Sequence, residues 1–246
     1  MIGTAKRARD ILHDDGLLSL ARSSTRYASA TLEDQWLKYK YKRRYGEIAP
    51  RPNERLWVDP TNLEYSISAS DMYDDDREYP RYGVLAGSWD EHKGLWRESR
   101  LFGSLRDRFV EDVPWEETYY YQHAVNEIAS GGSVGYLDGP QTRANLEAYL
   151  DELDELYEDI RDNGYDPSSI ISVHIGRNGE WIVSHGNHRR TIASILDVES
   201  VPVWVKFRHA EWQDRRRRFH RADSPDEVAE YEEFRSHPDL PEITSR

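Results

Sequence analysis

The chain contains no cysteine, and this absence excludes several kinds of chemistry. Disulfide bonds, metal sites built on thiolates and cysteine nucleophiles are all ruled out. No apolar run approaches the ~20 residues that a membrane-spanning helix requires, and the N-terminus has no apolar segment of the kind found in secretory signals. These absences predict a cytoplasmic protein, for which attachment at the periphery of a membrane remains an alternative.

Lysine is also scarce. Only six of the 33 basic residues are lysine, so 27 are arginine, and 46 acidic residues give a net charge of -13. A surface rich in carboxylates and poor in lysine suits a salt-loading cytoplasm, where ionic screening is nearly complete. The composition therefore predicts a halophilic protein, and the alternative is an ordinary acidic one. Hydrophobic residues make up only 37%, but eight Trp and 16 Tyr enlarge the core that 246 residues can build.

Positive charge is concentrated in the first part of the chain. Residues 1–55 hold 12 Lys and Arg against seven Asp and Glu, a net of +5, so the remainder carries -18. Leucine spacing predicts a basic amphipathic helical arm over residues 1–50, in which Lys38–Tyr45 interleaves basic residues with tyrosine. Such an arm suits a membrane surface or a membrane protein, reached through residues 1–45. The alternatives are stacking on single-stranded nucleic acid and simple packing on the body.

Periodicity predicts helices and strands over most of the remaining chain. Leu101, Leu105 and Phe109 form one helical stripe, and a second helix is predicted to start at Asp112–Pro114 and to continue through Tyr119–Ala129. The clearest amphipathic helix opens at Pro140 and ends at Asn163. Proline stops a short strand over Leu56–Pro60. The acidic run Asp71–Glu78 is predicted to be solvated, because like charges repel and need water.

The most informative local pattern lies in residues 170–205. Asn178-Gly179 is a strong hairpin signal, because both residues tolerate a positive φ. Gly186 then breaks the second strand, and Asn187 is positioned to cap a helix. The predicted order is a strand over Ile170–Ile175, a turn at Arg177–Gly179, a strand over Glu180–Ser184, a helix through Leu196 and a strand over Val201–Val205.

The start of this helix is predicted to bind an anion. A helix start offers free backbone N–H groups and the positive end of the dipole, and arginine can hold phosphate with two parallel hydrogen bonds. The predicted binding residues are Gly186, Asn187, His188, Arg189, Arg190 and Thr191. The alternative is that the arginines pair with acids on the helix opening at Pro140 and that His188 is a packed ring.

Residues 153–207 resemble the ParB/sulfiredoxin superfamily. The pattern of that superfamily is a helix ending near Ile-x-x-Asn-Gly, a hairpin, Gly-x-His-Arg or Gly-x-Arg-Arg, an Ala-containing helix and Ile-Pro-Val. This chain has Ile160–Gly164, Gly186–Arg190, Ala193 and Val201–Val203 at these places, and Leu56–Tyr65 resembles the first strand.

The resemblance implies an α+β fold with a small mixed sheet and helices. It implies a domain over residues 54–209 with a helical insertion at about 70–140, preceded by the arm and followed by a polar helical tail over 210–246. Gly186, His188 and Arg189 match the phosphate-binding turn of the superfamily, and Arg190 matches the second Arg of its DNA-partition members. The cysteine of sulfiredoxin falls at Asn187, so that activity is excluded.

These features predict a protein that binds a nucleotide, ATP or another, or a phosphorylated small molecule. The leading hypothesis is an NTPase or a small-molecule kinase with Glu180 or His185 as the catalytic base; Asp59 and Glu64 are further candidates. Mg²⁺ would be held mainly by the phosphates, and no dedicated protein metal site is predicted. The alternative is a non-catalytic nucleotide or phosphate sensor at a membrane-associated partner. DNA binding is a third hypothesis, but nucleic acid is not expected beside a body of net charge -18.

Overall fold

The Asn178-Gly179 turn forms the predicted hairpin, which joins β5 (Ile171–Ile175) to β6 (Trp181–His185). Gly179 has a φ of +86°, and a Cβ atom there would lie 2.6 Å from the ring of Trp212. Both the backbone conformation and the close ring therefore require glycine at this position.

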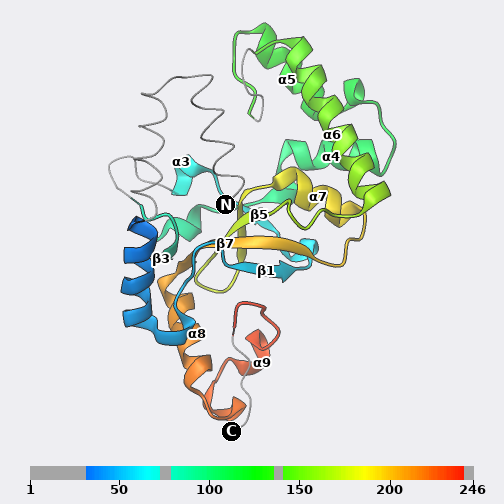
Figure 1. Cartoon of the computed structure of the whole chain (residues 1–246). Coiled ribbons are helices and arrows are strands. Elements are labelled where there is room, and N and C mark those ends of the chain that lie inside the picture. The colour runs from blue at the N-terminus through cyan, green and yellow to red at the C-terminus, as the bar shows by residue number, and fades with distance from the viewer. Residues whose placement is uncertain (1–31, 73–78, 136–140, 241–246) are drawn as a thin grey trace, which may run out of the picture. The chain divides into compact units, whose positions relative to one another are not determined.

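In the computed structural model, which describes residues 32–72, 79–135 and 141–240, this hairpin lies at the centre of a seven-stranded mixed sheet (Figure 1). The strand order is β1-β7-β5-β6-β2-β4, and β3 also pairs with β7. The other strands are β1 (Arg55–Val58), β2 (Tyr65–Ser66), β3 (Gly83–Leu85), β4 (Gly94–Leu95) and β7 (Val201–His209). The α+β class predicted from the sequence is confirmed.

The long strand β7 organises one half of the sheet. β1 pairs antiparallel with its first half, and β3 pairs parallel with its last three residues, so both occupy the same edge of β7. On its other edge, β7 pairs parallel with β5. The predicted insertion at about 70–140 is therefore not purely helical, because it contributes β3 and β4 to the sheet. Sequence periodicity missed these strands because they have only three and two residues.

Alternation along β5 and β6 buries side chains on both faces of the sheet. Val173 and Val183 belong to the main core, which also includes Ala193 of α7 (Asn187–Ile195). Ile182 belongs to a smaller core on the other face, with Trp89 and Phe207. Because a strand turns successive side chains to opposite faces, helix α7 covers one face and the segment around Trp89 covers the other.

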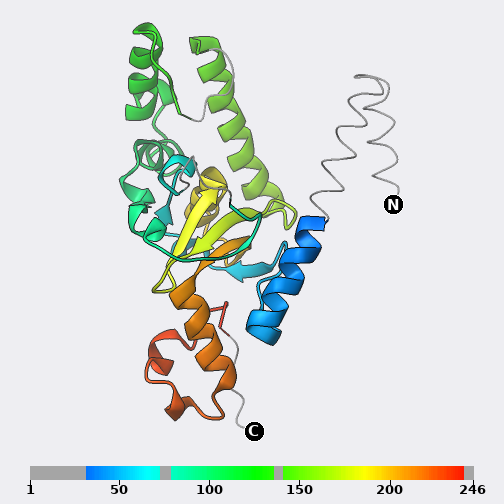
Figure 2. The same ribbon diagram turned by 90° about the vertical axis from the view of Figure 1, so that its left-hand side faces the viewer.

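Three helices build a further core of their own (Figures 1 and 2). α4 (Arg100–Phe109), α5 (Tyr119–Ala129) and α6 (Arg143–Asn163) contribute buried side chains that include Leu105, Ala124 and Leu150. Side chains of Ser99, Thr118 and Thr142 cap the starts of these helices. The positions of α4 and α6 follow the predicted apolar stripes, whereas α5 begins at Tyr119, after a separate 3₁₀ turn over Trp115–Glu117, and not at the predicted start near Pro114.

The C-terminal segment returns to the sheet. It contains α8 (Ala210–Arg221) and α9 (Tyr231–Phe234), and its Asp239 is 3% exposed. The Asp239 carboxylate accepts hydrogen bonds from Arg208 and from the Trp212 indole, and lies 3.2 Å from Arg216 Nε. Arg216 of α8 is therefore directed into the protein, where it is 6% exposed.

The chain divides into two compact units, Met1–Pro52 and Asn53–Arg246. Within the first unit, residues 32–45 form a helix, which lies in the helical arm predicted over residues 1–50. The predicted helices before residue 32, Pro140 and residues 73–78 of the acidic run lie outside the described residues. Among the helices of the described part of the chain, none is both long enough and apolar enough to cross a bilayer.

Candidate functional site

Helix α7 begins directly after β6, at Gly186. Gly186 has a φ of +98°, and a Cβ atom there would lie 3.2 Å from the side chain and 3.3 Å from the Cα atom of Ile171. Glycine is therefore needed for the left-handed conformation and for the close approach of β5. The sequence predicted that Asn187 caps this helix, which is wrong: Gly186 is the capping position and Asn187 is the first helical residue.

The start of α7 has no side-chain cap from its capping residue. The first backbone hydrogen bond of the helix runs from Arg190 N to Gly186 O at 3.1 Å. The amides of Asn187, His188 and Arg189 therefore lie before the first i to i−4 hydrogen bond of the helix. By contrast, α4, α5, α6 and α8 are all capped by a side chain. The helix start at which the sequence predicts an anion site therefore has no side-chain cap from Gly186.

His188 faces α6 and carries no charge at neutral pH. Its Nε2 atom is hydrogen-bonded to the Tyr149 hydroxyl at 2.7 Å, and the two rings meet edge to face at 5.7 Å. Burial, together with the nearby charges of Arg189 and His185, lowers the pKa of His188 to about 4. His188 is thus a packed ring, as the alternative interpretation held.

Arg190 is directed into the protein and is 1% exposed. Its Nη1 atom donates to the backbone oxygens of Leu63 and Tyr65, at 2.5 and 2.7 Å. Its guanidinium lies 4.8 Å from the centre of the Trp96 ring, within the range of a cation–π contact. Arg190 therefore connects α7 with β2 and with the segment before it.

Arg189 is the cation that remains at the turn. It is half-buried, and its Nε atom is buried without a hydrogen-bond partner among the described residues; the same holds for Asn187 Oδ1. Hydrogen bonds from Ser168 lower the pKa of Asp166, and the charge of Arg189 adds to this effect. Arg189 is therefore near Asp166, although the structure gives no ion pair between them. Buried polar atoms normally have partners, so Arg189 Nε and Asn187 Oδ1 have hydrogen-bonding capacity that the described residues do not use.

The two predicted catalytic residues lie at opposite ends of β6. His185 is exposed and directly precedes Gly186. Glu180 precedes the strand, and five residues of strand place it roughly 17 Å from the turn. Glu180 forms an ion pair with Lys93 at 3.2 Å, and hydrogen bonds together with Lys93 outweigh the effect of burial and lower its pKa. The structure therefore does not bring Glu180 to the predicted site.

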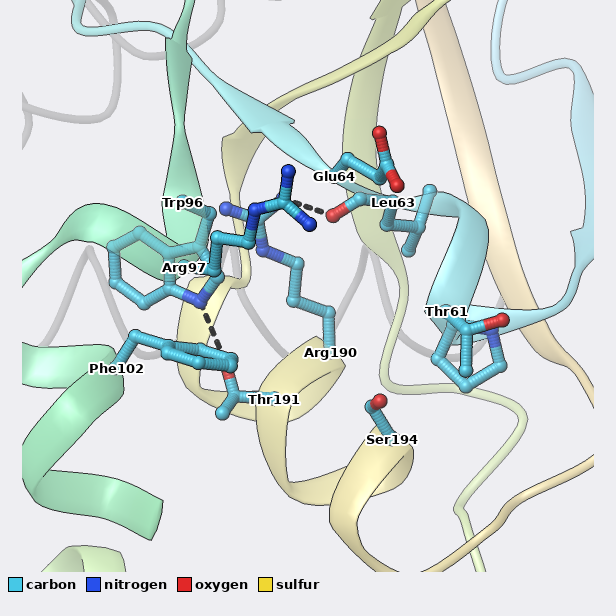
Figure 3. A pocket seen from close by; sticks show the side chains of 10 residues that line it. Thr61, Leu63, Glu64, Trp96, Arg97, Phe102, Arg190, Thr191 and Ser194 are labelled. Carbon is cyan, nitrogen blue, oxygen red and sulfur yellow. Dashed lines mark hydrogen bonds between the residues drawn. The ribbon is translucent and has the colours of Figure 1, made fainter.

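A cavity of about 160 Å³ lies beside α7 (Figure 3). The Trp96 and Phe102 rings line it, and the Trp96 indole donates to Thr191 Oγ1 at 2.6 Å. The polar and charged residues around the cavity are Thr61, Glu64, Arg97, Arg190, Thr191 and Ser194. Of the two carboxylates suggested near the first strand, Asp59 accepts hydrogen bonds from Thr61, whereas Glu64 is exposed at the cavity.

Sequence reasoning missed residues that surround α7 in space but are distant from it in the chain. Trp96, Arg97 and Tyr149 are separated from the turn by tens of residues, and no local pattern connects them with it. The turn also does not gather His188, Arg189 and Arg190 at one point. Successive residues of a helix differ in direction by about 100°, so their three side chains diverge.

Among the residues that the structure describes, no three or more His, Asp or Glu side chains form a group that could hold a metal ion. Comparisons of the chain with protein-family models, with curated proteins and with solved structures find no match. The function of the α7 turn therefore has to be understood from its own geometry and charge.

Proposed function

We propose that the protein binds a phosphate group, carried by a nucleotide or a phosphorylated small molecule, at the start of α7. The observation that carries this proposal is the open helix start at Gly186 with the orphaned Arg189 Nε beside it. Backbone amides and the helix dipole favour an anion there, and a guanidinium adds a charge-assisted hydrogen bond. His185 lies next to Gly186 in the chain and offers a further donor.

The size of the neighbouring cavity limits what it can hold. Small-molecule sites usually have volumes of roughly 300–1,000 Å³, whereas this cavity has about 160 Å³. Its lining includes the hydroxyls of Thr191 and Ser194 and the charges of Glu64 and Arg97. Gly186, Asn187 and Arg189 do not line this cavity, so a nucleotide whose phosphate lies at the start of α7 would be held outside it.

The order hairpin, glycine turn, helix and strand supports a ParB/sulfiredoxin-like arrangement, which we retain as a proposal. In such a site the phosphate would meet Gly186, Asn187 and Arg189, while Arg190 and Thr191 would support the helix. This division of roles differs from the expectation that six consecutive residues contact the ligand. Binding without turnover, as in a sensor, is consistent with the distance of Glu180 from the turn.

A phosphotransferase is the second candidate, favoured by the position of Glu64 at the cavity. A carboxylate there could accept a proton from a hydroxyl held near Ser194 and could contribute one ligand to a phosphate-bound Mg²⁺. Glu64→Gln should then abolish phosphate release or acceptor phosphorylation without weakening nucleotide binding. Equal turnover in Glu64→Gln and wild type would exclude this role, and binding with no turnover in the wild type would favour the sensor.

Thermal unfolding in the presence of ATP, ADP, CTP, pyrophosphate or inorganic phosphate tests the binding proposal. A ligand at about 100 times its Kd stabilises by about 2.7 kcal/mol, which raises the Tm of a domain of this size by several degrees. Arg189→Ala should remove most of this shift. Arg106→Ala, an exposed arginine of α4, is the matched control and should retain it. No shift with any probe, or an unchanged shift in Arg189→Ala, would contradict the proposal.

A further inference from the structure

The helix over residues 32–45 exposes three large apolar side chains on one face. Leu32 is 67% exposed, Trp36 58% and Tyr39 67%. Their spacing of four and three residues places them on one stripe of the helix. Because three large apolar side chains in one row are unusual on a surface facing water, this stripe indicates an interaction surface.

The other face of the same helix is already buried. Leu37 is 1% exposed and Tyr41 is 4% exposed, and they lie about 100° and about 140° around the helix from Trp36. The stripe of Leu32, Trp36 and Tyr39 is therefore a second apolar face, separate from the one that stabilises this helix.

Basic residues border the exposed stripe on both sides. Lys38 and Lys42 lie along one border, Lys40 and Arg44 lie along the other, and Arg43 continues the stripe; all five are exposed. Only Glu33 and Asp34 oppose them on this helix. A band of cations around an apolar stripe is complementary to a surface that is apolar inside and anionic at its boundary.

We infer that this face of helix 32–45 docks onto the surface of an anionic lipid bilayer. Interfacial helices bury an apolar face at the boundary between headgroups and acyl chains, where Trp and Tyr rings are favoured. Lysine side chains extend from such a helix to the headgroups, and each cation near an anionic surface adds attraction. The inference is independent of the phosphate site at α7.

Single-stranded nucleic acid fits these residues less well. Stacking needs free aromatic faces, but Lys40 Nζ lies over the Trp36 ring, 4.8 Å from its centre. Tyr41 is buried, Tyr45 is half-buried, and Leu32 has no ring to stack. A bilayer uses all three side chains of the stripe, whereas nucleic acid would use Tyr39 chiefly.

Vesicle flotation of the full chain tests the inference. We expect the protein to float with vesicles of phosphatidylglycerol and phosphatidylcholine, and to partition far less onto vesicles of phosphatidylcholine alone. The triple variant Leu32→Ser, Trp36→Ser and Tyr39→Ser should lower the partition coefficient by tenfold or more, because it removes the apolar contacts. The double variant Trp57→Ser and Tyr119→Ser removes exposed rings elsewhere, 54% and 58% exposed, and should float as the wild type does.

A charge variant separates the two contributions. Lys38→Glu with Lys42→Glu should reduce flotation about tenfold at low salt and have little effect in molar KCl, where charges are screened. All substituted side chains are exposed, so the Tm should be unchanged in every variant. Equal flotation of the triple variant and the wild type would overturn the inference. Absence of flotation on every vesicle, or gel-shift binding to single-stranded DNA in its place, would also overturn it.

Discussion

Arg208 and Asp239 form an ion pair inside the protein, with each side chain only 1% exposed. Arg208 Nε donates to both carboxylate oxygens, at 3.0 and 2.8 Å, and Glu54 lies 3.0 Å from the same guanidinium. The charges of Arg208 and Arg216 outweigh the effect of burial and hold the pKa of Asp239 below its usual value. The carboxylate of Asp239 therefore links the C-terminal segment to β7 and α8.

Replacing Asp239 should destabilise the protein strongly. Asp239→Asn removes the buried anion that both arginines share and leaves them only the more exposed Glu54, and breaking a buried pair in this way costs about 3–5 kcal/mol. Asp214→Asn is the matched control, because Asp214 pairs with Arg217 at the surface and such pairs contribute at most about 1 kcal/mol. Urea unfolding measures both values. Similar free energies of unfolding for the two variants would show that the C-terminal segment does not depend on Asp239.

His174 should make the protein sensitive to acid. It is fully buried between β6 and β7, and both ring nitrogens lack a hydrogen-bond partner among the described residues. Burial lowers its pKa from 6.5 to about 3. The unfolded chain therefore binds a proton that the folded chain does not, so the stability is complete above pH 6.5 and is lost as the pH falls toward 3.

His174→Phe should remove this dependence. Phenylalanine retains the contacts with Trp89 and Phe207 and has no polar atoms, so the stability at pH 7 should be unchanged or slightly higher. Binding of one proton changes the free energy of unfolding by up to about 1.4 kcal/mol per pH unit. Between pH 4 and pH 6 the free energy of unfolding of the variant should therefore depend less steeply on pH than that of the wild type, by part of that amount. Free energies of unfolding measured at several pH values test this, and parallel curves for variant and wild type would refute it.

Gly186 should be less replaceable than another glycine with positive φ. Gly164, which ends α6, has a φ of +79° and open space around its Cα atom, so Gly164→Ala should cost about 1 kcal/mol. Gly186→Ala carries a similar conformational cost and also forces Ile171 to move, so we expect a loss about twice as large. The comparison requires only thermal or urea unfolding of both variants. A smaller loss at Gly186 would mean that β5 and the turn are not held closely together.

Sequence reasoning succeeded where the determining residues are neighbours in the chain. The Asn178-Gly179 hairpin, the stripe of α6 and the start of α7 near Gly186 all follow from local propensity and periodicity. It failed where the partner is distant. Trp96 reaches Thr191 across 95 residues and Arg190 reaches the Leu63 oxygen across 127, and no pattern in a single sequence encodes such pairs.

The roles of the arginines illustrate the same limit. Arg189 and Arg190 are adjacent and chemically identical, yet one is half-exposed at the turn and the other is buried. Arg208 and Arg216 are likewise buried, because Asp239 meets them inside the protein. The sequence gives the number of charges in a segment, but only the fold determines which of them form ion pairs inside the protein.

Amide resonances at the start of α7 give the most direct test of phosphate binding. In a ¹⁵N-labelled, assigned sample, titration with inorganic pyrophosphate should shift the backbone amides of Gly186, Asn187, His188 and Arg189 first and furthest, with one common saturation curve. Arg189→Ala should raise the Kd obtained from that curve by about tenfold, the effect of losing one charge-assisted hydrogen bond. Shifts concentrated on the exposed arginines of α8, or no shifts near Gly186, would contradict the account.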